Sequence, residues 1–228
     1  IQTAVPFEMP EEGTPTLFEP HPDKAGVAFI VTGQETVGDG QQGIWRTESG
    51  GHSWEKVFDQ SVNFMTIGGN DPEYIVAGAG NSFVISSDGG DTWNRGSIEQ
   101  VTSVTDVEVV DGSIYAASGS VFGGGLLRSE DGGQSWTRLF GEADVVNSED
   151  AMLSVVSVSP DDPSTIYIGP EFFSNIRKSS DSGNSWISIQ AGLTTVGPLL
   201  SEGIRVDPRD ADRLFVLDNI SVNGGANW

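Results

Sequence analysis

Acidic residues recur at one position of a repeated eight-residue phrase, and repeated carboxylates are a first candidate for acid–base catalysis or metal binding. Three copies are strong, SSDGGDTW, SEDGGQSW and SSDSGNSW, and their acids are Asp88, Asp131 and Asp181. Two looser copies, TESGGHSW and SVNGGANW, carry Ser49 and Asn223 instead. Catalysis would not tolerate these replacements, whereas a turn would, because all three residue types accept backbone N–H bonds. We therefore interpret the acids as turn-stabilising residues.

The phrase, called the box below, always ends at a tryptophan, and the spacing of these residues predicts the architecture. They are Trp54, Trp93, Trp136, Trp186 and Trp228, separated by 39, 43, 50 and 42 residues. A period of about 40–45 residues containing several short strands is typical of a β-propeller. We expect each tryptophan to anchor its hairpin between sheets, because an indole buries a large apolar surface.

Apolar runs between the boxes predict the strands of each repeat. β-branched and aromatic segments of strand length end at small or turn residues, which indicates an all-β protein. An aromatic column recurs in the second run of each repeat, at Phe29, Tyr74, Tyr115, Tyr167 and Phe215. Each repeat thus predicts four antiparallel strands, A to D, and the box connects C to D.

We predict a single β-propeller over residues 1–228 with about five blades. The expected blades are approximately 13–60, 61–100, 101–141, 150–190 and 200–228 plus 1–7. Residues 1–9 are the expected closing strand D of the last blade, because the sequence read from Trp228 into Ile1 matches that following Trp186. A tight Asp218-Asn219 turn is expected in the same blade. Two alternatives remain open: a closed five-bladed ring and a slice of a longer repeat protein.

Charge and composition restrict the partners. The net charge is −22, from 33 acidic and 11 basic residues, which disfavours nucleic acid and insertion into membranes. The chain has no cysteine and two histidines, so no thiolate or histidine metal site and no cofactor are expected. Clustered carboxylates leave Ca²⁺ as a weak alternative. Because the chain begins at Ile1 and is strongly acidic, we expect a processed protein outside the cytoplasm, extracellular or at the cell surface.

The box resembles the Asp-box, or BNR repeat, of sialidases, xyloglucanases, sortilin-type receptors and photosystem assembly factors. The resemblance covers nearly the whole chain; it implies the propeller fold but not one activity, because these families include enzymes and binding proteins. Sialidase-type chemistry would need a tyrosine nucleophile, and all three tyrosines belong to the aromatic column. Xyloglucanase-type chemistry would need two carboxylates across a cleft, and nothing marks Glu12, Glu171 and Glu202 as containing such a pair. We therefore expect a non-catalytic binding or scaffolding module, with a glycoside hydrolase-related propeller as the alternative.

Long loops on the end opposite the boxes are the expected recognition surface, because binding residues concentrate on loops held by a rigid scaffold. The expected partner is a protein or a cell-surface or matrix assembly, with polysaccharide second. Exposed phenylalanines could stack on a sugar or enter a protein interface, or one of them could pack into a neighbouring blade; both interpretations stay open. The candidate ligand-binding residues are Glu35, Asp39, Phe122, Glu171, Phe172 and Phe173.

Overall fold

The computed structural model describes eight stretches of the chain: residues 14–33, 42–68, 71–79, 81–119, 124–144, 152–170, 175–193 and 203–228. The chain divides into two compact units, one formed by Ile1–Ala79 and Phe83–Arg95, the other by Gly80–Ser82 and Gly96–Trp228. Within the described residues, no helix is long and apolar enough to cross a membrane.

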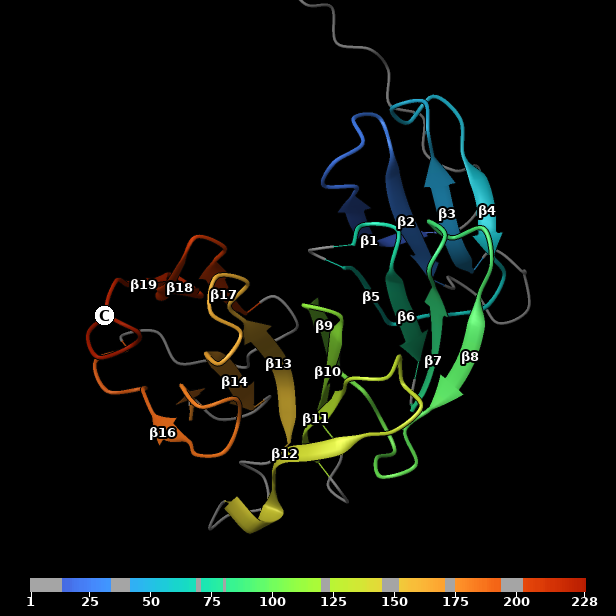
Figure 1. Ribbon diagram of the computed structural model, residues 1–228. Helices are drawn as coiled ribbons and strands as arrows, with labels where there is room; N and C mark the ends of the chain where they lie inside the picture. The colour runs from blue at the N-terminus through green and yellow to red at the C-terminus, as the bar shows by residue number, and fades with distance from the viewer. Residues whose placement is uncertain are drawn as a thin grey trace, which may run out of the picture. The chain divides into compact units, whose positions relative to one another are not determined.

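The first unit contains one antiparallel sheet and most of a second (Figure 1). The strands of the first are β1 (Thr14–Pro20), β2 (Ala28–Gly33), β3 (Gly43–Thr47) and β4 (Glu55–Phe58). The strands of the second are β5 (Phe64–Ile67), β6 (Ile75–Ala79), β7 (Ser82–Ser86) and β8 (Asn94–Ser97). In both sheets the strands neighbour one another in chain order, as expected for a propeller blade.

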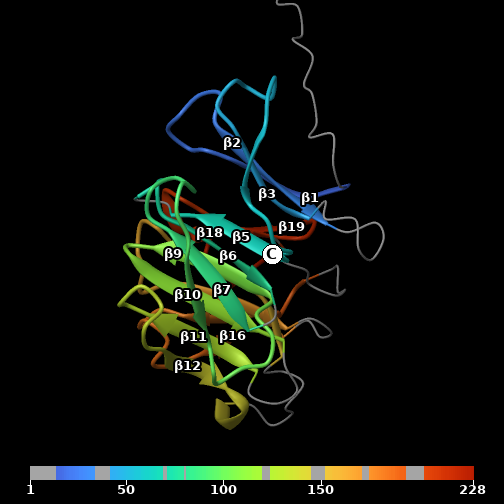
Figure 2. The same cartoon turned by 90° about the vertical axis from the view of Figure 1, so that its right-hand side faces the viewer.

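The second unit contains two four-stranded sheets and one three-stranded sheet. Figure 2 shows the first of them, made of β9 (Asp106–Val110), β10 (Ser113–Ser118), β11 (Gly125–Ser129) and β12 (Thr137–Gly141). The next contains β13 (Leu153–Val158), β14 (Ile166–Pro170), β15 (Arg177–Ser179) and β16 (Ile187–Ser188). The last contains β17 (Ile204–Asp207), β18 (Asp210–Val216) and β19 (Asn219–Ser221), and a short 3₁₀ helix, η1 (Glu142–Asp144), follows β12.

Apolar clusters lie between neighbouring sheets of each unit, because both faces of the middle strands are apolar and neither can be left in water. In the first unit, Phe29 and Ile44 pack with Ile75 and Ala77. In the second, Tyr115 and Phe140 pack with strands β13 and β14, and another cluster joins β13 and β14 to β17 and β18. The box tryptophans Trp93, Trp186 and Trp228 pack at the margins of these clusters.

The predicted fold class is confirmed: the described chain is all-β and consists of antiparallel sheets with the box between the third and fourth strands of each four-stranded sheet. Each sheet lies within one of the expected blade segments. The expected closing strand, residues 1–9, lies outside the described residues.

The last sheet differs from expectation in the position of its turn, and from the other sheets in the exposure of its aromatic residue. Its turn is formed by Leu217 and Asp218, and Asn219 already belongs to β19. Leu217 adopts a φ of 49°, a conformation unusual for a leucine, because two strands must be joined by two residues. Phe215 is 37% exposed, unlike Phe29 and Tyr167, which are fully buried.

Candidate functional site

The strong boxes close on themselves through one repeated set of hydrogen bonds. In the second sheet, the Ser86 hydroxyl donates to Asp88 Oδ1 at 2.8 Å and accepts the Gly90 N–H at 2.8 Å. Thr92 then donates its N–H to Asp88 Oδ1 at 2.8 Å and its hydroxyl to Oδ2 at 2.6 Å. The same bonds recur around Asp131 and Asp181. Both carboxylate oxygens of each box acid are therefore occupied within the turn.

These bonds also keep the box acids ionised. The hydroxyls of Thr92 and Ser135, followed by their backbone N–H groups, lower the pKa of Asp88 and Asp131 to about 2. The hydroxyl of Ser185 likewise lowers the pKa of Asp181. A carboxyl group in this state does not serve as a proton donor near neutral pH, because a general acid needs a pKa close to the working pH. The arrangement is that of a structural turn.

The glycines of the box are required by the turn. Gly89 and Gly90 have φ values of 69° and 94°, a region that L-residues avoid. In the fourth sheet Ser182 takes the first of these places at φ 61°. The residue at this first place also donates its backbone N–H to a carbonyl in the turn between the first two strands of its sheet. Gly89 donates to Glu73 O at 3.0 Å, and Ser182 donates to Ser164 O at 2.9 Å. Both turns therefore lie at one end of the sheet.

The box tryptophans connect neighbouring sheets within each unit. The indole N–H of Trp93 lies 3.0 Å from Val57 O on β4, and that of Trp186 lies 3.1 Å from Leu139 O on β12. Trp228 donates to Ile189 O, just beyond β16, at 2.8 Å. Each indole thus binds the fourth-strand segment of the preceding sheet, as expected for a buried aromatic with a polar edge.

Cations on the third strand form a second connection between sheets. Arg46, directly opposite Phe29 in the strand register, donates through Nη1 to Gly89 O at 2.9 Å and to Asp91 Oδ1 at 2.6 Å. Lys178, opposite Tyr167, binds Asp212 Oδ1 at 2.9 Å. Burial is the largest single effect on each cation and lowers its pKa, but the hydrogen bonds to the aspartates and the surrounding charge interactions together outweigh it and raise both pKa values.

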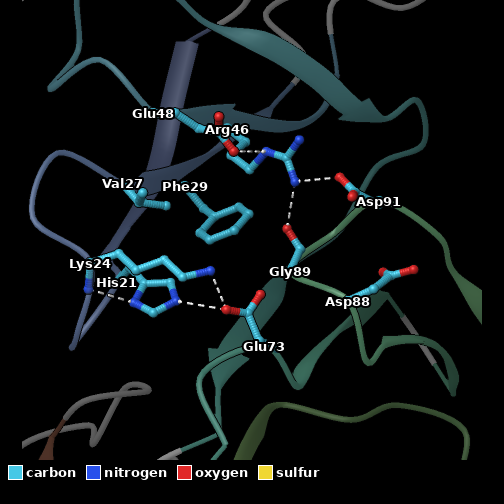
Figure 3. Close-up of a pocket in the computed structure, with 10 residues that line it drawn as sticks. All are labelled: His21, Lys24, Val27, Phe29, Arg46, Glu48, Glu73, Asp88, Gly89 and Asp91. Atoms are coloured by element: carbon cyan, nitrogen blue, oxygen red, sulfur yellow. Dashed lines mark hydrogen bonds and ion pairs between the residues drawn. The ribbon is translucent and has the colours of Figure 1, made fainter.

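A polar cavity of about 120 Å³ lies beside Arg46, between the first two sheets (Figure 3). His21 Nδ1 accepts the N–H groups of Asp23 and Lys24 at 3.1 and 3.0 Å, so its proton is on Nε2, which faces Glu73 Oε1 at 3.8 Å. The Lys24 ammonium pairs with the same Glu73 oxygen. The remaining lining residues are Val27, Phe29, Arg46, Glu48, Asp88, Gly89 and Asp91.

This cavity is too small to hold an organic ligand, since ligand pockets usually measure about 300–1,000 Å³. Its charged groups already pair across it, with Lys24 on Glu73 and Arg46 on Asp91. We therefore assign it to the junction between the sheets. Among the described residues, no three His, Asp or Glu side chains are grouped closely enough to hold a metal ion.

The predicted ligand-binding residues Glu35, Asp39, Phe122, Glu171, Phe172 and Phe173 all lie outside the described residues. Sequence reasoning missed the role of Arg46 and Lys178 in joining the sheets. A signal was present, because Arg46, Arg128 and Lys178 each directly precede the first residue of a box. It excluded a histidine metal site and assigned no role to His21, whose burial beside Glu73 has no signature in the linear sequence.

Comparison with known proteins shows similarity of fold without close sequence similarity. The sequence matches no protein-family model and no curated protein sequence at a significant level. Among solved structures, the GH74 xyloglucanase of Xanthomonas campestris aligns over 95% of this chain with a TM-score of 0.63 and 16% identity. YCF48 of Cyanidioschyzon merolae aligns over 92% with a TM-score of 0.64 and 14% identity. The extracellular domain of BT4673 from B. thetaiotaomicron aligns over 92% with a TM-score of 0.63 and 12% identity.

The chain spans 45%, 65% and 26% of the lengths of these three chains. At these identities the likeness establishes the fold and nothing about activity. Together with the sheet topology, it places the chain among proteins with the β-propeller fold.

Proposed function

We propose that this chain is an Asp-box β-propeller that acts outside the cytoplasm as a non-catalytic binding or scaffolding module. The observation that carries the proposal is the state of the box acids. The box acids are the most regular chemical pattern of the chain. Their carboxylates already accept hydrogen bonds within their own turns, at Asp88, Asp131 and Asp181. The repeats therefore build a rigid support, and recognition is assigned to the loops at the other end of the sheets.

The proposed partner is a protein or an assembly at a cell surface or in a matrix. The strong negative charge favours a partner with a basic surface and disfavours nucleic acid. The extracellular domain of BT4673 shares the fold, which supports a location outside the cytoplasm. The proposed contact residues remain those predicted from the sequence, with Phe172 and Phe173 at their centre.

A glycoside hydrolase-related propeller is the second candidate, and the specific observation in its favour is the likeness to a GH74 xyloglucanase. The chain spans less than half of that enzyme. A polysaccharide would then be bound, and cleaved only if a second carboxylate stood opposite the first across a cleft.

The test combines a glycan array that includes xyloglucan fragments, a panel of chromogenic glycosides, and affinity purification from extracellular or cell-surface extracts. Retention on a glycan or a purified protein without turnover supports binding, whereas turnover of any glycoside overturns the non-catalytic proposal. The double variant Phe172→Ser/Phe173→Ser is expected to lose at least tenfold in affinity, about the value of one buried aromatic contact. The matched control is Val222→Ser, a 69% exposed apolar residue within the last box, which is expected to bind normally.

A further inference from the structure

The first strands of two neighbouring sheets in the second unit, β9 and β13, are joined by side chains. They belong to different sheets and lie side by side (Figure 1). The Thr105 hydroxyl, just before β9, donates to Leu153 O at 2.7 Å. Further along, the Val156 N–H donates to Asp106 Oδ2 at 3.0 Å and the Val158 N–H to Glu108 Oε2 at 2.5 Å.

The register explains why two carboxyl groups fit here. Asp106 and Glu108 are two residues apart on β9, so their side chains leave the same face of the strand. The amide groups of Val156 and Val158 are also two apart, so each carboxyl group meets one amide. The next junction is made differently: there Ser157 Oγ accepts the Val206 N–H of β17 at 3.3 Å. Of these two junctions, the one between β9 and β13 is therefore held by titratable groups.

Glu108 is half-buried, and its neighbours act on its charge in both directions. Its cross-strand neighbour is the buried Tyr115 on β10, followed by Arg128 on β11, which pairs with Glu130. The facing strand β13 contains no titratable side chain, and β17 contributes Arg205. Burial raises the pKa of Glu108 to about 8; the Val158 amide and Arg205 act against this rise, and the charge of Asp106 adds to it.

We propose that Asp106 and Glu108 form a proton-dependent clasp between β9 and β13, which tightens as the pH falls from the alkaline to the mildly acidic range. The direction follows from linkage. If the pKa of a carboxyl group is higher in the closed state than in the open state, binding of the proton stabilises the closed state. This stabilisation is fully present below the ordinary glutamate pKa. That stabilisation is lost progressively as the pH rises towards 8, by up to tenfold in the opening equilibrium per pH unit, and the loss ends once Glu108 is ionised in both states.

Amide hydrogen exchange at Val156 and Val158, corrected for intrinsic chemistry, measures the opening of the clasp directly. In the wild type, the opening constant is expected to rise several-fold to tenfold per unit between pH 5.5 and 7.5 and to level off above 8. Glu108→Gln keeps an oxygen for the Val158 amide but cannot ionise, so its opening constant is expected to be nearly independent of pH. Glu99→Gln removes an exposed carboxylate from the same unit and is expected to follow the wild type.

The exchange of Val206 at the next junction separates local from global opening. A pH-dependent opening confined to Val156 and Val158 supports the clasp. Equal pH dependence in wild type and Glu108→Gln, or the same rise at Val206, overturns it. Should the variant fail to fold, carbon-13 titration of the Glu108 carboxyl in the wild type decides the matter, and an ordinary glutamate titration overturns the proposal.

Discussion

Replacing Trp186 tests the role assigned to the box tryptophans, because its ring and its N–H group can be removed separately. The indole N–H lies 3.1 Å from both Leu139 O and Gly183 O. The ring meets Phe140 edge-on, with centroids 5.4 Å apart and an interplanar angle of 66°. Trp186 is only partly buried, so its truncation costs less than that of a core aromatic.

The expected losses follow from these contacts. Trp186→Phe keeps an aromatic ring and removes the hydrogen bond, a cost of about 1 kcal/mol. Trp186→Ala also removes the edge-to-face contact, worth about 1 kcal/mol, and the apolar burial, for a total of about 3 kcal/mol. Ile187→Ala, at the adjacent 62% exposed residue, is expected to cost less than about 0.5 kcal/mol.

Urea unfolding followed by circular dichroism measures these differences without relying on the fluorescence of the residue that is changed. A double-mutant cycle with Phe140→Leu is expected to recover about 1 kcal/mol of coupling. A Trp186→Ala variant within about 1 kcal/mol of the wild type would refute the assigned packing role. Equal losses for the Phe and Ala variants would instead show that the hydrogen bond, and not the ring, holds the junction.

Three further outcomes are expected. Trp136→Ala should destabilise the fold by about 3 kcal/mol, as for Trp186, because Trp136 is half-buried as well, and an unchanged melting temperature would contradict this. Asp131→Asn should destabilise the wild-type fold at neutral pH. The difference should shrink as the pH falls from 4 towards 2, because the lowered pKa of Asp131 contributes stability only while its carboxyl is ionised; a constant difference across this range would count against the turn bonds. The double variant Asn223→Asp/Asn227→Ser should give the last box the hydroxyl–carboxylate bond of the strong boxes. A gain of about 1 kcal/mol would raise the melting temperature by about 2–4 °C; a lower melting temperature in calorimetry would contradict this.

The box could be predicted from the sequence because its information is local. The Ser, Asp and Gly residues of SEDGGQSW bond within eight residues, so composition and spacing suffice to predict a turn. The tryptophan period then predicts repeated sheets. The Leu217–Asp218 turn was misplaced by one residue, because no local signal predicts a leucine at positive φ. The register of β18 and β19 sets that position.

Contacts between sheets depended on the tertiary structure. Arg46 directly precedes a box in the sequence, but its partner Asp91 lies 45 residues away and is determined by the packing of two sheets. In the sequence, Glu108 looks the same as any polar residue of a strand with alternating polar and apolar residues. Only the approach of β13, 50 residues later, leaves it half-buried and brings the Val158 amide to its carboxyl group.

The sequence by itself therefore determined the strand content, the box turns and the repeat, since these arise from interactions between residues close in the chain. The tertiary structure decided which charged groups are buried and what they bind, since desolvation and charge pairing depend on neighbours that no local pattern specifies. For that reason the structural role of the box acids could be inferred from the order of residues alone, whereas the proton-dependent clasp at Glu108 emerges only from the packing of β9 against β13.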